Sequence, residues 1–221
     1  MTELLNIRDL GQEQVYQDVF AMQMELHAQR VKGDIPDTLL LLEHRPVYTL
    51  GTSASLGHVI FSADKLASCG IDLVRTTRGG DVTYHGPGQL VGYPIVHLGD
   101  LGIKVLEYLT ALEEVIIKVA AGYGVDAGRD ARNRGVWVGN SKLAAMGIRV
   151  SRQTTMHGFA LNVNTQLSDY SGIVACGLPG VGVTSLQQLT GSALDMAQVK
   201  AALSEIFIDV IGYNKVQNEQ I

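Results

Sequence analysis

The spacing of apolar residues changes near residue 122, and this change constrains the fold more than any other feature of the sequence. Residues 103–121 carry apolar side chains three and four positions apart, the interval that predicts an amphipathic helix. Beyond them, residues 135–139, 142–150 and 154–163 form short apolar runs separated by tight turns, which predicts strands. Helical and strand patterns in separate stretches of one chain indicate the α+β class.

The helix expected over residues 103–121 has one buried face and one polar face. Glu113, Glu114 and Lys118 fall between the apolar positions and are expected to face water. The apolar positions that mark the buried face are Val105, Leu109, Leu112, Ile116 and Val119.

The N-terminal part of the sequence predicts further strands around another helix. Residues 4–10 are typical of a short strand, and a helical pattern starts at Gln12 and stops at Gly33, a residue type that commonly ends helices. The run 38–42 is too short and too apolar for an exposed helix, so it predicts a buried strand. Residues 47–50 are expected to be its partner.

The C-terminal part predicts a last helix and a loose tail. Residues 192–195 resemble a capping box that opens the helix, and the polar residues from Asn214 onward are expected to fray. The face of this helix is marked by Val199, Leu203, Ile206 and Val210. With no internal repeat and no linker-like segment, residues 1–221 are expected to form a single α+β domain, a mixed or antiparallel sheet with packed helices.

Charge and cysteine content narrow the class of protein. The chain has 46% apolar and 18% charged residues, as ordinary globular proteins do, and its net charge of −5 argues against a nucleic-acid binder. Its two cysteines, Cys69 and Cys176, form no disulfide framework or zinc motif, and the histidines show no metal-ligand spacing. The sequence shows neither a signal peptide nor an apolar run of about 20 residues, so we expect a cytoplasmic protein with no membrane partner.

The segment Arg78–Gln89 reads RGGDVTYHGPGQ and packs four glycines into twelve positions. Glycine brings backbone close to a neighbouring group because it has no Cβ and adopts positive φ easily. Such a loop is either an elaborate turn or a ligand site. Arg78 and His85 within it favour the ligand site.

Cys176 is the candidate nucleophile. It is flanked by glycine and proline in a loop, where a thiol can be presented to a substrate. A nucleophilic thiol needs a lowered pKa, which a nearby cation provides, and the candidates for that cation are Lys142, His85 and His157. Each has a plain alternative: Lys142 as a strand residue whose amine reaches water, and the histidines as hydrogen-bonded structural residues.

Together these segments resemble the lipoyl(octanoyl) transferase family. The resemblance is carried, in order, by 78–89, by 142–147 (KLAAMG), by 157–162 (HGFALN), and by Cys176–Gly177 followed by 183–186 (VTSL). Four ordered blocks that include both reactive residues are far more specific than one glycine motif. The sequence departs from the family at Ala175, where the family usually has proline before the cysteine.

The resemblance implies the biotin/lipoate protein ligase catalytic fold and an octanoyltransferase activity. The enzyme would move an octanoyl or lipoyl group from acyl carrier protein to a specific lysine of lipoyl domains, in 2-oxoacid dehydrogenase E2 subunits and glycine cleavage H protein. Cys176 would hold the acyl group as a thioester, and Lys142 would lower the pKa of the thiol and then help remove a proton from the incoming amine. No ATP and no other cofactor is implied.

The resemblance also implies an acyl pocket, with Met146 and Phe159 as the bulky residues that would help close its end. The residues expected to line it are Arg78, Gly79, Gly80, Asp81, Val82, Thr83, Tyr84, His85, Ala145, Met146, Gly147, Gly158, Phe159 and Ala160.

Two other functions remain open from the sequence. An ATP-dependent lipoate or biotin protein ligase would share the fold but would not need Cys176, and the chain has no P-loop pattern. A non-catalytic module that binds acyl carriers would keep the pocket but would not need the pair of Lys142 and Cys176. Arg129, Arg132 and Arg134 are either a solvated loop or a patch that docks an acidic partner.

Overall fold

The computed structural model describes residues 4–174 and 180–220. In this part of the chain an eight-stranded sheet has the order β10-β8-β9-β6-β2-β1-β11, with β7 paired to β8. Its strands are β1 (Leu4–Gln14), β2 (Asp37–His44), β6 (Gln89–Ile95), β7 (Gly135–Val138), β8 (Ser141–Ser151), β9 (Thr154–Asn162), β10 (Gly182–Val183) and β11 (Lys215–Gln220). β2 pairs in parallel with β1 but antiparallel with β6, so the sheet is mixed, as predicted.

A second, three-stranded sheet has the order β4-β3-β5, and its strands are β3 (Val47–Leu50), β4 (Asp72–Arg75) and β5 (Val82–His85). The prediction that residues 47–50 pair with residues 38–42 is therefore wrong. Both edges of β2 are already occupied, one by β1 and the other by β6, so β3 pairs with strands that follow it in the chain.

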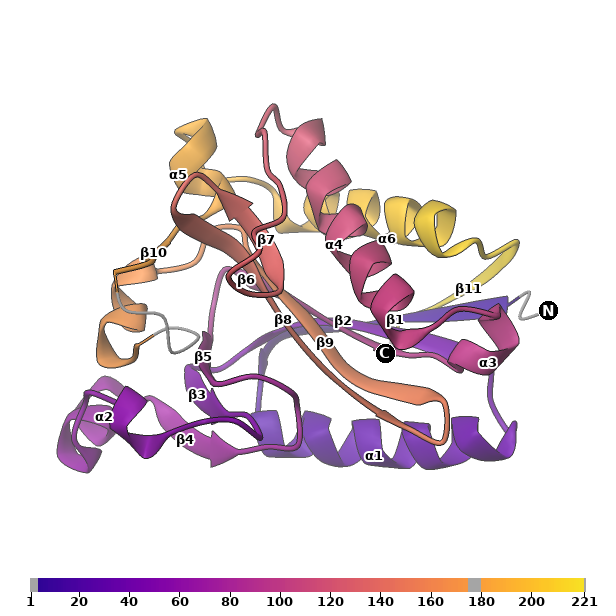
Figure 1. The fold of residues 1–221 in the computed structure, drawn as a ribbon, viewed down its shortest axis with the longest axis horizontal. Coiled ribbons are helices and arrows are strands. Elements are labelled where there is room, and N and C mark those ends of the chain that lie inside the picture. The colour runs from indigo at the N-terminus through magenta and orange to yellow at the C-terminus, as the bar shows by residue number, and fades with distance from the viewer. Residues whose placement is uncertain (1–3, 175–179, 221) are drawn as a thin grey trace.

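Helices cover both faces of the large sheet (Figure 1). α4 and α6 lie side by side on one face and α1 lies along the other, against β6 and β9. The helices are α1 (Tyr16–Lys32), α2 (Ala63–Cys69), α3 (Leu98–Leu101), α4 (Val105–Gly122), α5 (Leu186–Thr190) and α6 (Met196–Ile211), with 3₁₀ turns η1 (Leu56–His58) and η2 (Leu167–Gly172).

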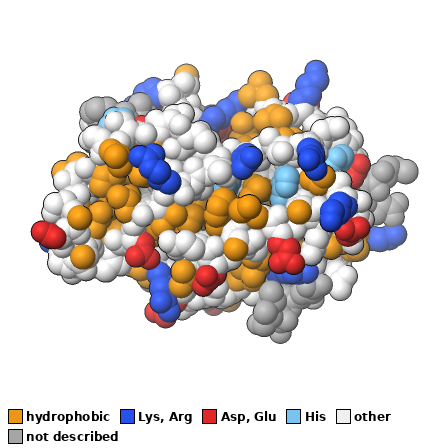
Figure 2. All heavy atoms as spheres, turned by 90° about the horizontal axis from the view of Figure 1, so that it is seen from below, with side chains coloured by type: hydrophobic (Ala, Val, Ile, Leu, Met, Phe, Trp, Pro, Cys, Tyr) orange, Lys and Arg blue, Asp and Glu red, His pale blue; other side chains and the backbone are white. Residues whose placement is uncertain are grey.

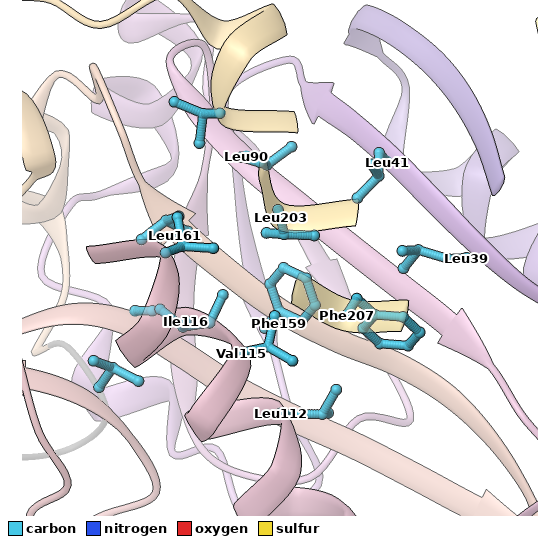
Figure 3. Close-up of a cluster of buried hydrophobic side chains, with 14 of the residues drawn as sticks. Leu39, Leu41, Leu90, Leu112, Val115, Ile116, Phe159, Leu161, Leu203 and Phe207 are labelled. Atoms are coloured by element: carbon cyan, nitrogen blue, oxygen red, sulfur yellow. The ribbon is translucent and has the colours of Figure 1, made fainter. Parts of the chain in front are cut away.

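The largest core lies between the sheet and the α4–α6 layer. Figure 3 shows Phe159 of β9 pointing into this layer, between Leu112 and Val115 of α4 and Phe207 of α6. A smaller core on the other face packs α1 against β2 and β6. Because both faces are covered, β2 is buried along its whole length, which is why its sequence is apolar at consecutive positions.

The predicted helices form, with shifted ends. α1 starts at Tyr16 rather than Gln12, because β1 continues to Gln14, and it ends at Gly33, whose φ is 80°. α6 starts after Asp195, whose carboxylate accepts a hydrogen bond from the amide of Ala197, so no capping box at residue 192 is used.

The tail expected to fray is a strand. β11 pairs in parallel with β1, with Leu4 opposite Lys215 and Ile7 opposite Asn218. Strand pairing is made by the backbone, so a polar edge strand gives no apolar signal in the sequence.

The surface on the α1 side carries basic and acidic side chains interspersed, with hydrophobic atoms between them (Figure 2). No helix in residues 4–174 and 180–220 is both long and apolar enough to cross a bilayer. In the same residues no three His, Cys, Asp or Glu side chains come together as metal ligands would.

Candidate functional site

A pocket lies between the glycine loop, β8, β9 and the start of α1, and it holds about 510 Å³ of space not filled by protein atoms, part of it open to solvent. The predicted residues that line it are Arg78, Gly80, Asp81, Val82, Thr83, His85, Lys142, Ala145, Met146, Gly147, Gly158, Phe159 and Ala160. The structure therefore brings together three blocks that are up to 80 positions apart in the chain.

Two residues of the predicted set, Gly79 and Tyr84, do not line the pocket. The amide of Gly79 donates to the carbonyl of Ile148 at 3.1 Å, so its role is to hold the loop against β8. The hydroxyl of Tyr84 donates to Asp169 at 2.8 Å. Tyr84 belongs to β5, where alternate side chains point to opposite faces, and it packs into the core of the small sheet.

Met146 and Phe159 both line the pocket. They face each other across the β8–β9 pair, and both pack against the α4–α6 core. The neighbouring small residues line the pocket as its floor, with Ala145 opposite Ala160 and Gly147 opposite Gly158. Whether Met146 and Phe159 close its end stays a prediction.

Gly147 is where the loop approaches β8 most closely. A Cβ on Gly147 would lie 2.7 Å from the carbonyl oxygen of Gly79, too close for any real side chain. The glycine of the KLAAMG block therefore lets the loop close over the strand.

Arg78 anchors the loop. Its Nε donates to Thr49 Oγ1 at 3.0 Å, its Nη2 to the Thr49 carbonyl at 2.5 Å, and its Nη1 to the Gly79 carbonyl at 3.0 Å. The side chain is buried and ties the loop to β3. These contacts make Arg78 the anchor of the loop.

His85 and His157 are neutral structural residues. Burial, together with the nearby His44 and Arg78, holds the pKa of His85 well below its usual range. Burial lowers the pKa of His157 to about 3, and the positive charges of Arg78 and Arg149 act in the same direction. His157 Nε2 lies 3.0 Å from Thr77 Oγ1, and its ring stacks on Phe20 with 5.5 Å between centroids. Neither imidazole is charged at neutral pH, so Lys142 is the remaining candidate for the cation.

Lys142 stands at the start of β8, in the wall of the pocket, with 5% of its surface exposed. Its Nζ donates to the carbonyl of Arg134 at 2.9 Å and lies 4.8 Å from the centroid of the Trp137 ring. This burial and these contacts exclude the alternative in which Lys142 is a strand residue whose amine reaches water. The amine is held in a fixed place beside the pocket.

Cys176 and Ala175 lie outside the described residues. Before them, the amide of Val174 donates to the carbonyl of His58 at 2.8 Å. After them, β10 pairs in parallel with β8, and Val183 is the register partner of Lys142.

Arg129, Arg132 and Arg134, the arginine cluster, form ion pairs within the protein. One acidic residue of α4 is buried beside them. Arg129 and Arg134 both pair with Glu113, which is 1% exposed, and Arg132 pairs with Asp130 at 2.6 Å. The prediction that Glu113 faces water is wrong, because these arginines and the amide of Gly135 compensate its charge. Val105, expected in the core, is 43% exposed in the first turn of α4.

The sequence reasoning missed three residues that line the pocket: Tyr16, Tyr93 and Asn133. Tyr16 and Tyr93 reach it from α1 and β6, and both are buried against the ring of His44. Their only signal is a tyrosine in an otherwise apolar pattern, which is equally typical of a core residue.

A model of the lipoyl protein ligase A/B catalytic domain matches residues 15–208. The chain belongs to this family. An octanoyltransferase of Caldicellulosiruptor saccharolyticus is 45% identical over 199 residues, covering 89% of this chain and 85% of the relative, and one of Alkaliphilus metalliredigens is 42% identical, covering 96% and 98%. The resemblance stated from the four sequence blocks is thus confirmed, and the protein is an acyltransferase of the octanoyltransferase type.

Solved structures of lipoate and biotin protein ligases show the same fold. A lipoate-protein ligase A bound with ATP superposes with a TM-score of 0.75 at 16% identity, covering 100% of this chain and 90% of that one. The biotin protein ligase of Aquifex aeolicus superposes with a TM-score of 0.54 at 10% identity, covering 94% of this chain and 68% of that one. The predicted biotin/lipoate ligase fold is confirmed. At these identities the ligases share the architecture alone, whereas the relatives at 42–45% identity are octanoyltransferases.

Proposed function

We propose that this enzyme transfers an octanoyl group from acyl carrier protein to a specific lysine of lipoyl domains, through a thioester on Cys176. The acceptors would include lipoyl domains of 2-oxoacid dehydrogenase E2 subunits and the glycine cleavage H protein, in the cytoplasm. The observation that carries the proposal is the placement of Lys142. Its amine is buried in the wall of the pocket, and its strand pairs with β10, the strand that follows the Cys176 segment.

The shape of the pocket suits a saturated acyl chain. From Lys142 to Gly147 the wall follows about 17 Å of strand at roughly 3.3 Å per residue, enough for an extended eight-carbon chain. The floor is formed by Ala145, Gly147, Gly158 and Ala160, which leave room for a chain to lie along the strands. Burial of each methylene contributes about 0.8 kcal/mol to binding.

In the first half-reaction the ammonium of Lys142 stabilises the Cys176 thiolate, and the thiolate attacks the thioester carbonyl of the donor. The tetrahedral intermediate collapses, the C–S bond to the carrier breaks, and the departing carrier thiolate takes a proton from Lys142. Octanoyl-Cys176 and the free carrier thiol result. Because one thioester replaces another, no external energy source is needed.

In the second half-reaction the lysine amine of the lipoyl domain attacks octanoyl-Cys176. A free lysine has a pKa near 10.4, so nearly all of it is protonated at neutral pH, and a base must accept a proton for an amide to form. Lys142, which gave its proton to the carrier thiolate in the first half-reaction, accepts this proton, and Cys176 leaves as a thiolate beside the restored ammonium. The amide bond forms and the enzyme regains its starting state.

Intact-protein mass spectrometry tests the proposal. The enzyme is incubated with octanoyl acyl carrier protein in the absence of ATP, and an octanoyl adduct is expected that neutral hydroxylamine removes. Cys69, which is exposed in α2, provides the matched control, because Cys69→Ser should keep the adduct and Cys176→Ala should lose it. Octanoyl transfer by the wild type without any adduct, or an adduct that persists in Cys176→Ala, would rule out the proposed intermediate.

A further inference from the structure

Glu113 has an unusual position for a carboxylate of a surface helix. It lies on the sheet side of α4, and its Oε2 accepts hydrogen bonds from Arg134 Nη1 at 2.9 Å and Arg129 Nε at 3.2 Å. Its Oε1 accepts the backbone N–H of Gly135 at 3.1 Å. Both arginines keep a large exposed fraction, 38–40% of the side chain, whereas the Glu113 side chain is 2% exposed. The buried partner in this cluster is the carboxylate, and it is directed at the backbone of residue 135.

The N–H that Glu113 binds and the carbonyl that Lys142 binds belong to one peptide group. Gly135 supplies the N–H, and Arg134 supplies the C=O that accepts Lys142 Nζ at 2.9 Å. In a trans peptide these two groups point in opposite directions. The carboxylate of Glu113 and the ammonium of Lys142 therefore lie at the two ends of a single peptide plane.

Gly135 makes this arrangement possible. Its φ is 136°, and a Cβ there would lie 2.9 Å from Lys142 Cε and 2.5 Å from the Ala144 carbonyl oxygen. Any larger residue at position 135 would therefore push the Lys142 side chain away from the Arg134–Gly135 peptide. The chain just before the Arg134–Gly135 peptide is also held, because Trp137 Nε1 donates to the Asn133 carbonyl at 3.2 Å.

We propose that Glu113 is a positioning residue for octanoyl transfer, acting on Lys142 through the Arg134–Gly135 peptide. A negative charge at the N–H end polarises the peptide and makes its carbonyl a stronger acceptor, as in other hydrogen-bonded chains of low dielectric. The stronger acceptor fixes the Lys142 amine in the wall of the pocket. This inference rests on the proposed role of Lys142 in the reaction. The competing explanation is that Glu113 does no more than neutralise Arg129 and Arg134.

Steady-state kinetics of octanoyl transfer separate the two explanations. Glu113→Gln keeps the size and an acceptor oxygen but removes the charge, and we expect kcat to fall about tenfold, with KM for octanoyl acyl carrier protein unchanged within twofold. Glu114→Gln is the matched control, because Glu114 pairs with Arg129 at 2.7 Å from the next position of α4 without touching the Arg134–Gly135 peptide. Its kcat should stay within twofold of the wild type. An equal kcat for both variants would overturn the proposal.

The amide resonance of Gly135 provides a second measurement that does not depend on turnover. In ¹H–¹⁵N spectra of the full chain, Lys142→Met and Glu113→Gln should each move the Gly135 amide proton upfield, because each removes one of the two groups that polarise its peptide. The amide of Gly124, which donates to Ala121 at the end of α4, should stay in place. A Gly135 amide that is indifferent to Lys142→Met would overturn the coupling even if Glu113→Gln failed to fold.

Failure of the Glu113 role and failure of the Cys176 intermediate give different results. If the wild type transfers octanoyl without an adduct on Cys176, the chemistry proposed above fails, yet the kcat ratio and the Gly135 shift still report whether Glu113 acts through Lys142. If the adduct forms and Glu113→Gln is as fast as Glu114→Gln, the Cys176 intermediate stands and the role of Glu113 falls.

Discussion

Arg78 and Thr49 are joined by both the side-chain oxygen and the backbone carbonyl of the threonine. The guanidinium reaches the two acceptors with its Nε and Nη2. Thr49 lies in the middle of β3, and Arg78 opens the loop that forms one wall of the pocket. The position of this wall is thus set by the small sheet, outside the main eight-stranded sheet.

Removing this anchor should loosen the wall and destabilise the fold. Arg78→Met keeps the buried stem but leaves the Thr49 acceptors without the guanidinium, so we expect the free energy of unfolding to fall by about 2–4 kcal/mol, as for other buried charged hydrogen bonds. Urea denaturation measures this, with Arg75→Met, an exposed arginine of β4, as control. The control should stay within about 0.5 kcal/mol of the wild type. Equal losses in the two variants would contradict the anchoring role.

Chain-length selectivity should depend on the small residues of the floor. Ala145→Leu adds three carbons on the pocket side of β8, so transfer from octanoyl acyl carrier protein should fall at least tenfold, while transfer from a butanoyl donor should fall less. The measurement is kcat/KM for donors of four, six and eight carbons. A uniform loss for all donors would indicate a damaged site instead of a shortened pocket.

Met146→Leu is the matched control for that variant. Met146 neighbours Ala145 but packs against the α4–α6 core, and leucine conserves its volume. Its chain-length profile should equal that of the wild type. A shifted profile would show that Met146 does set the length of the pocket.

His157 should make the enzyme sensitive to mild acid. Its pKa is lowered to about 3 in the folded state, whereas an unfolded histidine has a pKa near 6.5, so the unfolded chain binds the proton first. Stability is therefore lost as pH falls from 6.5 towards 3, and the loss from this residue at pH 5 is about 2 kcal/mol.

His157→Asn tests this contribution and tolerates the positive φ of 59° at this position. Urea denaturation at pH 7 and pH 5 should show a smaller loss of stability for the variant than for the wild type. The buried His44 contributes equally to both proteins, and His85 nearly so, because His157 is the smallest of the causes that lower the pKa of His85. An identical loss in both would mean that His157 titrates normally.

Removing β11 should weaken the edge of the sheet. A chain that stops at Asn214 leaves the β1 edge unpaired, and exposed strand edges pair with other molecules. We expect a lower midpoint of thermal unfolding and concentration-dependent association in size-exclusion chromatography. A monomer with an unchanged midpoint would support the loose tail expected from the sequence.

The parts of the fold that the sequence predicted are those with strong local patterns. β8 and β9 are apolar runs on either side of a tight turn, and β2 is apolar at consecutive positions because both of its faces are covered. β11 was missed because its pairing is made by backbone groups, and the β3 partner was wrong because the sequence does not reveal which edges of β2 are taken.

The candidate site was predictable where it lies in contiguous blocks. The loop from Arg78, the KLAAMG block and the HGFALN block meet in one pocket. Glu113 was missed for a physical reason. Helical periodicity counts a carboxylate as solvated, and its burial depends on arginines and an amide that lie 16 to 22 positions further along the chain.

The pairing of β11 with β1 has a consequence for how the chain is made. β1 leaves the ribosome before its outer neighbour, residues 215–220, which emerges about 200 residues later. During synthesis at roughly 5–20 residues per second, this edge stays open for at least ten seconds. In that interval the unpaired edge can pair with other chains, so protection of the nascent chain should affect the yield of active enzyme.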